Sequence, residues 1–261
     1  MTMYVITHKK FNYSLPDGFK TLLVGANKNA NPDNYLADNT GDNISDKNSS
    51  YCELTGLYWM WKNTSDDKVG LCHYRRYFSN FRDEKSLKKD VLLHGTTLPA
   101  SIESLDKDLE DHDWVVAAPV KCNYGSIIQD FNTYHHAKDM KITREVVNKL
   151  YPEFIEGFDK AMKLSAGSYY NMFYTTHEKF DGYCKWLFEI LSEVEKRVDI
   201  SGYDNYQQRL FGFLSERLFN VYLEATNAKV AYRYVFQTDE TGRYFIFKNF
   251  VKSILAPFRN K

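Results

Sequence analysis

Short apolar runs alternate with longer amphipathic segments along most of the chain. The short runs are rich in β-branched and aromatic residues and end at turn-forming residues, which is typical of buried strands. The longer segments carry apolar residues at helical spacing, which predicts helices with one buried face. The predicted strands are 4–7, 21–25, 69–74, 114–118, 169–175 and 230–237. The predicted helices are 54–62, 102–109, 143–164 with a break at Pro152, 176–198 and 206–225.

Two of the predicted helices follow a Ser/Thr-x-x-Glu sequence, which is the pattern of a capping box. Ser50 and Glu53 form the first box, and Thr175 and Glu178 form the second. In such a box the hydroxyl and the carboxylate each accept a hydrogen bond from a free amide of the first helical turn. We therefore expect Glu53 to serve the backbone of its own helix.

The alternation of strands and helices, without an internal repeat, favours an α/β fold with a mainly parallel central sheet that helices flank. We assign residues 1–237 to one such domain with a helical C-terminal half, and residues 238–261 to a basic amphipathic tail. Parallel sheets bind their ligands beyond the carboxyl ends of the strands. Residues that follow the strands are therefore the first candidates for a binding site.

Basic residues follow two of the predicted strands. The run VGLCHYRRYF places His73, Tyr74, Arg75 and Arg76 at the end of one strand. Thr7 ends the first strand, and His8 and Lys9 follow it in the same way. The planar guanidinium fork matches phosphate oxygens and stays charged at any working pH, so this arrangement suits a diphosphate. The alternative is an ordinary solvated edge of the sheet.

The long loop 26–48 is dense in Asn, Asp and Gly. Asp42 and Asn43 lie beside Gly41, and these residue types bind ribose hydroxyls or a uracil edge where glycine lets the backbone come close. The alternative is that the polar side chains of this loop stabilise its own turns.

The last predicted helix carries a polar stripe. Arg209, Glu216 and Asn220 lie along one face, seven and four positions apart. A carboxylate that an arginine orients can act as a base, whereas a polar stripe of this kind more simply faces water.

Composition and charge exclude several classes of function. The chain has 261 residues with 34 basic and 34 acidic side chains, so no overall positive field favours nucleic acid. No apolar window is long enough to cross a bilayer, and the start of the chain does not look like a secretion signal. Four widely separated cysteines without a CxxC pair indicate neither a zinc site nor a disulfide framework, which favours the cytoplasm.

Metal ligands are poorly placed in the sequence. Two Asp-x-Asp pairs, Asp106 with Asp108 and Asp111 with Asp113, precede a strand, whereas a metal-diphosphate site needs carboxylates after one. We therefore expect no metal ligand and no resident cofactor, and leave a manganese or magnesium ion open.

Four runs in order, TGDNISDKNSSYCELTGLYWMWKN, VGLCHYRRYF, YYNMFYTTHEKFDGYCKWLF and YQQRLFGFLSERLFNVYL, resemble a family of a domain of unknown function. This family is common in bacterial capsular and exopolysaccharide clusters, and the resemblance extends to about residue 226. Its members are regarded as glycosyltransferases, and a related domain of a lipopolysaccharide O-antigen polymerase is a β-galactofuranosyltransferase that uses a UDP-sugar. The resemblance thus implies a GT-A-like fold and the transfer of a hexose, by inversion, to a lipid-linked or growing glycan.

The resemblance also implies where the substrates bind. Asp42 and Asn43 would belong to the donor site, and His73, Tyr74, Arg75 and Arg76 to the diphosphate region. Asn171, Arg209, Glu216 and Arg217 would lie on the sugar side. Our hypothesis is that the arginines replace a metal ion and that Glu216 is the base, with Asp42 and Glu53 as the other carboxylates in the matching runs. The alternative function is a non-catalytic module that binds a sugar nucleotide or a glycan.

The tail 238–261 mixes phenylalanines and aliphatic residues with Lys248, Lys252, Arg259 and Lys261. A basic amphipathic segment can lie in a lipid interface, which would place the protein at the cytoplasmic face of the inner membrane. Packing of the tail against the domain is the alternative.

Overall fold

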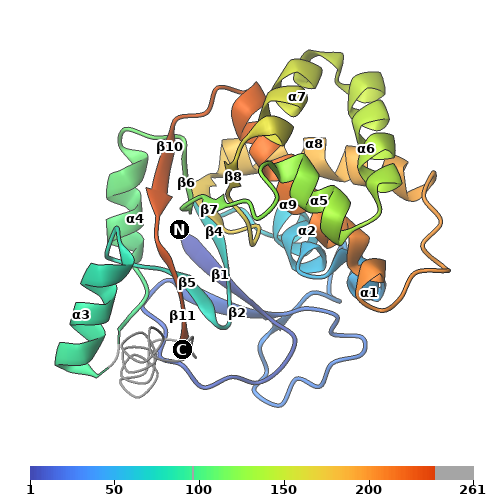
Figure 1. Ribbon diagram of the computed structural model, residues 1–261. Coiled ribbons are helices and arrows are strands. Elements are labelled where there is room, and N and C mark those ends of the chain that lie inside the picture. The colour runs from blue at the N-terminus through green and yellow to red at the C-terminus, as the bar shows by residue number, and fades with distance from the viewer. Residues whose placement is uncertain (96, 239–261) are drawn as a thin grey trace, which may run out of the picture.

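A single mixed sheet forms the centre of the molecule (Figure 1). The structure is a computed structural model that describes residues 1–95 and 97–238. Seven strands follow one another across the sheet in the order β10-β6-β9-β4-β1-β2-β3, and β5 and β11 extend it beside β4. These strands are β1 Thr2–Thr7, β2 Phe19–Leu23, β3 Leu36–Ala37, β4 Lys68–His73, β5 Arg76–Phe78, β6 Trp114–Ala117, β9 Phe173–Thr176, β10 Val230–Arg233 and β11 Val235–Gln237. A separate pair is formed by β7 Val120–Lys121 and β8 Ala166–Gly167.

Most neighbouring strands of the seven run parallel. β1 pairs in parallel with β2 and β4, β2 with β3, and β6 with β10. β9 lies between β4 and β6 and is antiparallel to both. The expectation of a mainly parallel central sheet is confirmed, and β9 is the strand that reverses the direction.

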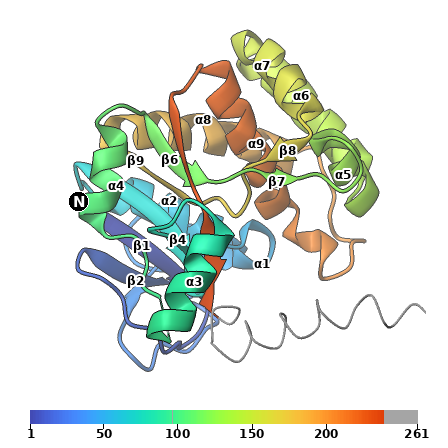
Figure 2. The ribbon, with the colours of Figure 1, turned by 60° about the vertical axis from the view of Figure 1, so that its left-hand side comes forward.

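Helices cover both faces of this sheet (Figures 1 and 2). α3 and α4 lie on one face, and α2 with α5 to α9 lie on the other. The helices are α1 Asn48–Tyr51, α2 Leu54–Asn63, α3 Glu84–His94, α4 Ile102–Leu109, α5 Ile127–Tyr134, α6 Ala137–Leu150, α7 Ile155–Lys163, α8 His177–Glu195 and α9 Leu210–Ala225. A short 3-10 turn, Gln207–Arg209, leads directly into α9.

Alternate residues of each central strand enter different cores, because successive side chains of a strand point to opposite faces. In β1, Tyr4 and Ile6 join the large core under α2, α8 and α9, while Met3 and Val5 join the smaller core under α3 and α4. All four side chains are at most 3% exposed. Both faces of β1 are therefore buried, and the residues that reach the solvent-accessible edge of the sheet follow its carboxyl end.

The predicted helix at 102–109 and the helix break at Pro152 are confirmed. The two predicted capping boxes are wrong. The Ser50 hydroxyl donates to the Lys47 carbonyl, and the Thr175 hydroxyl donates to the Asp113 carbonyl. The first box fails because Cys52, at a φ of +52°, ends α1 before Glu53 begins α2. Glu53 is instead the N-cap residue of α2, and its side chain makes no capping hydrogen bond there.

Gly56 lets α2 approach the sheet closely. A Cβ atom at this position would lie 2.7 Å from Ile6 Cδ1 and 2.8 Å from Val24 Cγ1, so any side chain would push the helix away. Ile6 and Val24 stand at the ends of β1 and β2. The N-terminus of α2, with Glu53, is therefore held at the edge where these strands end.

No helix within residues 1–95 and 97–238 is long and apolar enough to span a bilayer. The predicted amphipathic tail, 238–261, lies outside the described residues except for Thr238. The domain boundary at residue 237 therefore stays a prediction.

Candidate functional site

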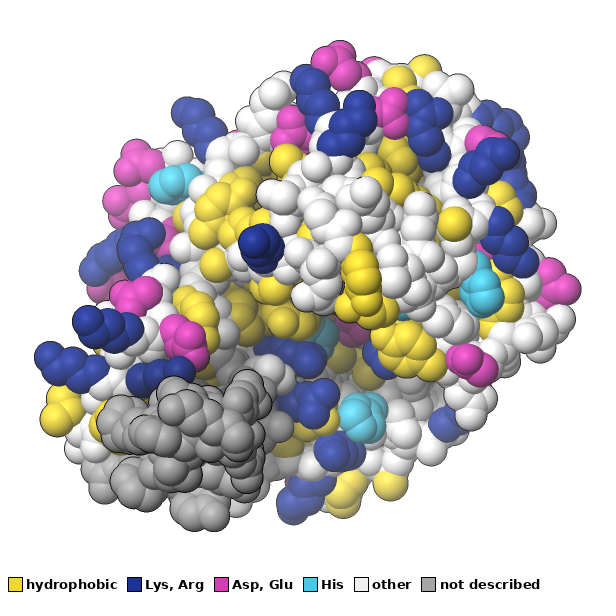
Figure 3. Space-filling view, viewed as in Figure 1, with side chains coloured by type: hydrophobic (Ala, Val, Ile, Leu, Met, Phe, Trp, Pro, Cys, Tyr) yellow, Lys and Arg dark blue, Asp and Glu magenta, His cyan; other side chains and the backbone are white. Residues whose placement is uncertain are grey.

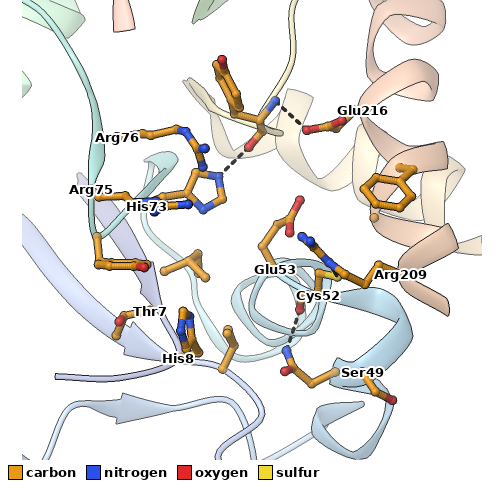
Figure 4. Close-up of a pocket in the computed structure, with 17 residues that line it drawn as sticks. Thr7, His8, Ser49, Cys52, Glu53, His73, Arg75, Arg76, Arg209 and Glu216 are labelled. Carbon is orange, nitrogen blue, oxygen red and sulfur yellow. Dashed lines mark hydrogen bonds between the residues drawn. The ribbon is translucent and has the colours of Figure 1, made fainter. Parts of the chain in front are cut away.

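A cavity of about 440 Å³ opens at the carboxyl ends of β1, β2 and β4 (Figures 3 and 4). Parallel pairing brings these three strand ends to one edge of the sheet, and α2 and α9 close the cavity from the helical side. In Figure 3 basic side chains gather in the hollow beside acidic ones and a histidine. The cavity is lined by Ile6, Thr7, His8, Val24, Asn48, Ser49, Cys52, Glu53, His73, Tyr74, Arg75, Arg76, Tyr170, Arg209, Gly212, Phe213 and Glu216.

Three arginines bring positive charge into the cavity. Arg75 and Arg76 follow β4, and Arg209 enters from the start of α9. The Arg76 guanidinium lies 4.7 Å from the centre of the Tyr170 ring, and its Nε is buried without a hydrogen-bond partner among the described residues. Arg209 Nε donates to Cys52 Sγ at 3.3 Å. A buried donor without a partner is costly, so Arg76 is prepared to bind an acceptor from a ligand.

Two carboxylates, Glu53 and Glu216, face the same cavity (Figure 4). Burial raises the pKa of both, and the Coulomb repulsion between them adds to the rise at Glu216. Glu216 is fully engaged: Oε2 pairs with Arg217 Nη1 at 2.8 Å, and Oε1 accepts the Tyr170 amide at 3.0 Å. Glu216 is thereby fixed in position.

Glu53 has a different environment. Its Oε1 accepts a hydrogen bond of 2.6 Å from Asn171 Nδ2, which also donates to Ser215 Oγ at 2.8 Å. The second oxygen, Oε2, has no hydrogen-bond partner among the described residues. The Asn171 hydrogen bond, then the backbone amide of Glu53 itself, and then the charges of Arg209 and Arg76 oppose the rise in the pKa of Glu53 that burial causes. Glu53 therefore offers one free carboxylate oxygen inside the cavity.

His73 is neutral at physiological pH. Burial, with a smaller contribution from the charges of Arg76 and Arg75, lowers its pKa to about 4 although the hydrogen bond to Tyr170 opposes this shift. Its Nε2 lies 2.6 Å from the Tyr170 carbonyl oxygen, and because a carbonyl can only accept, Nε2 carries the proton. Tyr170 thus binds His73 through its carbonyl and Glu216 through its amide.

The backbone of the site is strained. Among the described residues five that are not glycine have a positive φ, and three of them, Cys52, Tyr170 and Asn171, lie at this site. Their φ values are +52°, +75° and +51°. Such conformations cost free energy for residues with a Cβ atom, and they concentrate at functional sites where the surrounding structure enforces them. The strain here directs Glu53 and the Tyr170 backbone toward the cavity.

Comparison of the sequence with models of known protein families assigns the chain to a family. Residues 2–228 match the model described as Domain of unknown function (DUF4422). The chain belongs to this family. The resemblance noted in the sequence is thereby confirmed, and no curated protein matches the chain.

A solved structure shares the fold of this DUF4422 protein. It is described as the apo structure of the bifunctional glycosyltransferase WbbM, and it matches with a TM-score of 0.80 and 29% sequence identity. The match covers 91% of this chain but 45% of the WbbM chain, so this chain spans less than half of that protein. The predicted fold class, a glycosyltransferase-type α/β fold, is confirmed.

The cavity of the DUF4422 protein brings together most of the residues singled out in the sequence. Thr7, His8, Tyr74 and the other residues of the HYRR run line it, as do Arg209 and Glu216. Asn171 and Arg217 stand directly behind the lining, where they bind Glu53 and Glu216. The residues predicted from the carboxyl ends of the strands and those predicted from the polar stripe of the last helix thus lie in the same cavity.

Three predicted donor-site residues lie outside the lining of this cavity. Lys9 lies over the Tyr74 ring, 5.5 Å from its centre, and borders a neighbouring hollow. Asp42 accepts a hydrogen bond of 3.1 Å from the Tyr58 hydroxyl, and Asn43 Nδ2 donates to the Gly41 carbonyl. Asp42 is therefore bound to a side chain of α2, whereas Asn43 is bound within its own loop, and their role in donor binding stays a prediction.

Several lining residues were not singled out in the sequence. Asn48, Ser49, Cys52, Tyr170 and Phe213 are examples. Asn48 Nδ2 donates to the Cys52 carbonyl at 2.7 Å and so stabilises the sharp bend before Glu53. Nothing in the residue type of Cys52 indicates a left-handed backbone, because asparagine and glycine are the usual residues there.

Metal ligands do not cluster within the described part of the chain. There, no three side chains of His, Cys, Asp or Glu are close enough to hold one ion. Asp106 accepts from Lys68 Nζ and the Tyr174 hydroxyl, and Asp108 pairs with Arg233. The metal dependence of this DUF4422 protein stays open.

Proposed function

We propose that this protein is a glycosyltransferase that transfers a hexose from a UDP-sugar to a lipid-linked or growing surface glycan. One observation supports this most: three arginines and two half-buried carboxylates, Glu53 and Glu216, meet in one cavity at the carboxyl edge of the sheet. The arginines suit a diphosphate, and a free carboxylate suits proton transfer from a sugar hydroxyl. The likeness to WbbM, which is described as a glycosyltransferase, supports the same activity.

The arginines would stabilise the leaving group. When the bond between the anomeric carbon and UDP breaks, negative charge develops on the β-phosphate. Arg75, Arg76 and Arg209 line the cavity, and the unpaired Nε of Arg76 can donate to a phosphate oxygen. Fixed cationic donors of this kind lower the barrier where charge develops. We propose that they do the work that a divalent cation does elsewhere.

We propose Glu53 as the base, in place of Glu216. Both oxygens of Glu216 are engaged by Arg217 and the Tyr170 amide, whereas Glu53 keeps Oε2 free. Burial raises the pKa of Glu53, which strengthens it as a base, and the Asn171 hydrogen bond limits this rise. In a single displacement, the acceptor hydroxyl gives its proton to Glu53 while its oxygen bonds to the anomeric carbon. UDP leaves from the opposite side, so the configuration inverts.

The identity of the donor is part of the proposal. Galactofuranose is our preferred sugar because of the family resemblance, and the cytoplasmic face of the inner membrane is our proposed location. A non-catalytic module that binds a sugar nucleotide is the competing function. It would bind UDP in the same cavity and transfer nothing.

Thermal unfolding in the presence of nucleotides tests the proposal. UDP, GDP, CMP and ADP are each added with manganese and, separately, with a chelator. A ligand that binds only the folded chain raises the melting temperature, by more at higher concentration. We expect UDP alone to raise it, with or without chelator. No shift with any nucleotide would contradict a nucleotide-sugar donor, and a shift that requires manganese would contradict the role of the arginines.

Turnover separates the enzyme from the binding module. UDP-galactofuranose, UDP-galactopyranose and UDP-glucose are incubated with the protein, and the release of UDP is followed. We expect release from at least one of them, and faster release when an acceptor glycan is present. Binding of UDP without any release would favour the module.

A further inference from the structure

Exposed tyrosines gather beside the cavity. Among the described residues four tyrosines are strongly exposed: Tyr124 at 50%, Tyr134 at 43%, Tyr206 at 53% and Tyr232 at 47%. The first three lie on or next to α5 and at the turn that leads into α9, and we call them the tyrosine track. Figure 3 shows hydrophobic side chains along one side of the hollow that holds the basic residues. Exposed aromatic rings in a group indicate a recognition surface.

The tyrosine track continues the wall of the cavity. Phe213 lines the cavity, and the Tyr206 ring lies 5.0 Å from it between ring centres. His135 stacks on Phe213 at 4.1 Å and on Tyr206 at 6.0 Å. Tyr134 precedes His135 in the chain, and Tyr124 lies 5.4 Å from Tyr134. A continuous series of aromatic rings, in contact or adjacent in sequence, thus extends from the cavity to the outer surface.

Hydrogen bonds to the backbone fix the position of the tyrosine track. The buried Asp130 carboxylate accepts the amide protons of Asn123 at 3.0 Å and Tyr124 at 2.6 Å. Gln207 Nε2 donates to the Tyr134 carbonyl at 2.8 Å, which ties the end of α5 to the turn before α9. A prearranged binding surface loses little conformational entropy when a ligand arrives.

Around Tyr124 and Tyr134 the surface is polar and almost without charge, whereas Tyr206 has the Arg209 guanidinium 6.0 Å from its ring centre and the exposed Asp204 two residues before it. Between Cys122 and His135 the only charged residue is Asp130, which is 7% exposed and engaged by the backbone. Burial lowers the pKa of His135 to about 4, so this ring is neutral as well. Exposed side chains with amide and hydroxyl groups surround the tyrosines, namely Asn123, Gln129, Asn132 and Thr133.

We propose that the tyrosine track binds an uncharged saccharide chain, and that this chain is the acceptor whose end enters the cavity. Tyrosine rings present apolar faces for the C–H groups of a sugar ring, and their hydroxyls bond to its polar edge. Amides donate to and accept from sugar hydroxyls. An anionic polymer or lipid head group would instead need cations around Tyr124 and Tyr134, where residues 122–135 include no lysine or arginine. The inference rests on the proposed function, since it places the acceptor end beside Glu53.

Binding to immobilised oligosaccharides tests the track directly. The full chain is applied to an array of neutral and uronic-acid-containing bacterial oligosaccharides, without nucleotide. We expect wild-type protein to bind neutral chains, and Tyr134→Ala and Tyr206→Ala each to weaken this binding by about tenfold. Tyr206→Phe, which keeps the ring, should retain most of it. Tyr232→Ala removes an equally exposed tyrosine on β10, away from the track, and should bind as wild type.

The outcomes separate the track from the proposed function. Absence of binding to every neutral chain, or equal binding by the wild type and both alanine variants, would overturn the track. Thermal unfolding with nucleotides measures ligand binding in the cavity and does not depend on glycan binding. In this assay UDP should raise the melting temperature of both alanine variants as much as that of the wild type. With an active donor, the same variants should raise the KM for the oligosaccharide that binds the array and leave the acceptor-free release of UDP unchanged. If UDP did not raise the melting temperature of the wild-type protein but the protein still bound glycans, the proposed transferase activity would be contradicted. The tyrosine track would then stand as a glycan-binding site alone.

Discussion

Asn171 Nδ2 donates a hydrogen bond of 2.6 Å to Glu53 Oε1, and it does so from a backbone held at a φ of +51°. Two segments far apart in the sequence, the start of α2 and the entry to β9, are joined by this contact. The amide stabilises the charged form of the carboxylate, and it fixes which Glu53 oxygen remains free for a substrate. Asn171 thus controls both the orientation and the proton affinity of the proposed base.

Replacement of Asn171 by alanine should shift the pH dependence of turnover. The lost hydrogen bond is the largest of the effects that hold down the pKa of Glu53, so this pKa should rise further. The base must be ionised to accept a proton, so kcat should begin to fall, on the acid side, about one pH unit higher than in wild type. Asn227→Ala is the matched control, because Asn227 has a φ of +48° on the exposed surface. An unchanged pH profile in Asn171→Ala would contradict the role given to this contact.

Glu53→Gln should abolish most turnover and retain nucleotide binding. The amide keeps the shape of the side chain and can still accept from Asn171, but it cannot take a proton, so kcat should fall by a factor of about 10² to 10⁴. The UDP dissociation constant, measured by calorimetry, should change far less. If Glu53→Gln kept near wild-type turnover and Glu216→Gln lost it, Glu216 would be the base.

Glu216→Gln should destabilise the fold. It removes the partner of Arg217, whose side chain is 8% exposed and would be left as a buried unpaired charge. Breaking one side of such a pair costs about 3 kcal/mol of unfolding free energy. Urea titration measures this, with Glu103→Gln as the control at an exposed pair with Lys107, where the expected change is below about 1 kcal/mol. Equal stability of the two variants would contradict a structural role of Glu216.

Arg76→Lys should weaken UDP binding although the charge is kept. A lysine lacks the Nε donor that is unpaired in the cavity, and its single ammonium cannot reproduce the fork. Loss of a charged hydrogen bond should raise the UDP dissociation constant about tenfold in calorimetry. Arg82→Lys, at an arginine whose side chain is 74% exposed, should leave it unchanged. If Arg76→Lys and Arg82→Lys bound UDP with the same affinity, the phosphates of UDP would not bind at Arg76.

His73 should make the fold sensitive to acid. Its pKa of about 4 lies below the ordinary value of about 6.5, so protonation favours the unfolded chain. The stability contribution is complete above pH 6.5 and is lost as the pH falls toward 4. His73→Gln should make this part of the stability curve shallower by up to about 1.4 kcal/mol per pH unit. Urea titrations across this range measure the slope, and parallel curves for the two proteins would show that His73 does not contribute.

Much of this arrangement follows from simple rules of sequence reading. His73 to Arg76 reach the cavity because parallel strands end at one edge, and an apolar run that stops at charged residues marks that edge. Arg209 and Glu216 were found through helical spacing. These are local patterns, so one sequence is enough to reveal them.

Other features depend on contacts that no local pattern encodes. Ser50 and Glu53 match a capping box, but the left-handed Cys52 interrupts the helix, and the bend is stabilised from Asn48 and by the packing of Gly56 on β1 and β2. The residue types of the loop at Asp42 suit both a ligand and the turns of the loop itself. Only the tertiary structure distinguishes these uses.

The reversed direction of β9 has a consequence for how the chain folds. Residues that precede an antiparallel strand lie at the edge where its parallel neighbours end, and this is how Tyr170 and Asn171 reach the ends of β1 and β4. The cavity therefore needs segments from residue 6 to residue 216 at once. Contacts so distant in sequence form late and slowly, since a large loop must close first. A nascent chain should acquire nucleotide affinity only in its final folding step, after α9 has been synthesised and has docked.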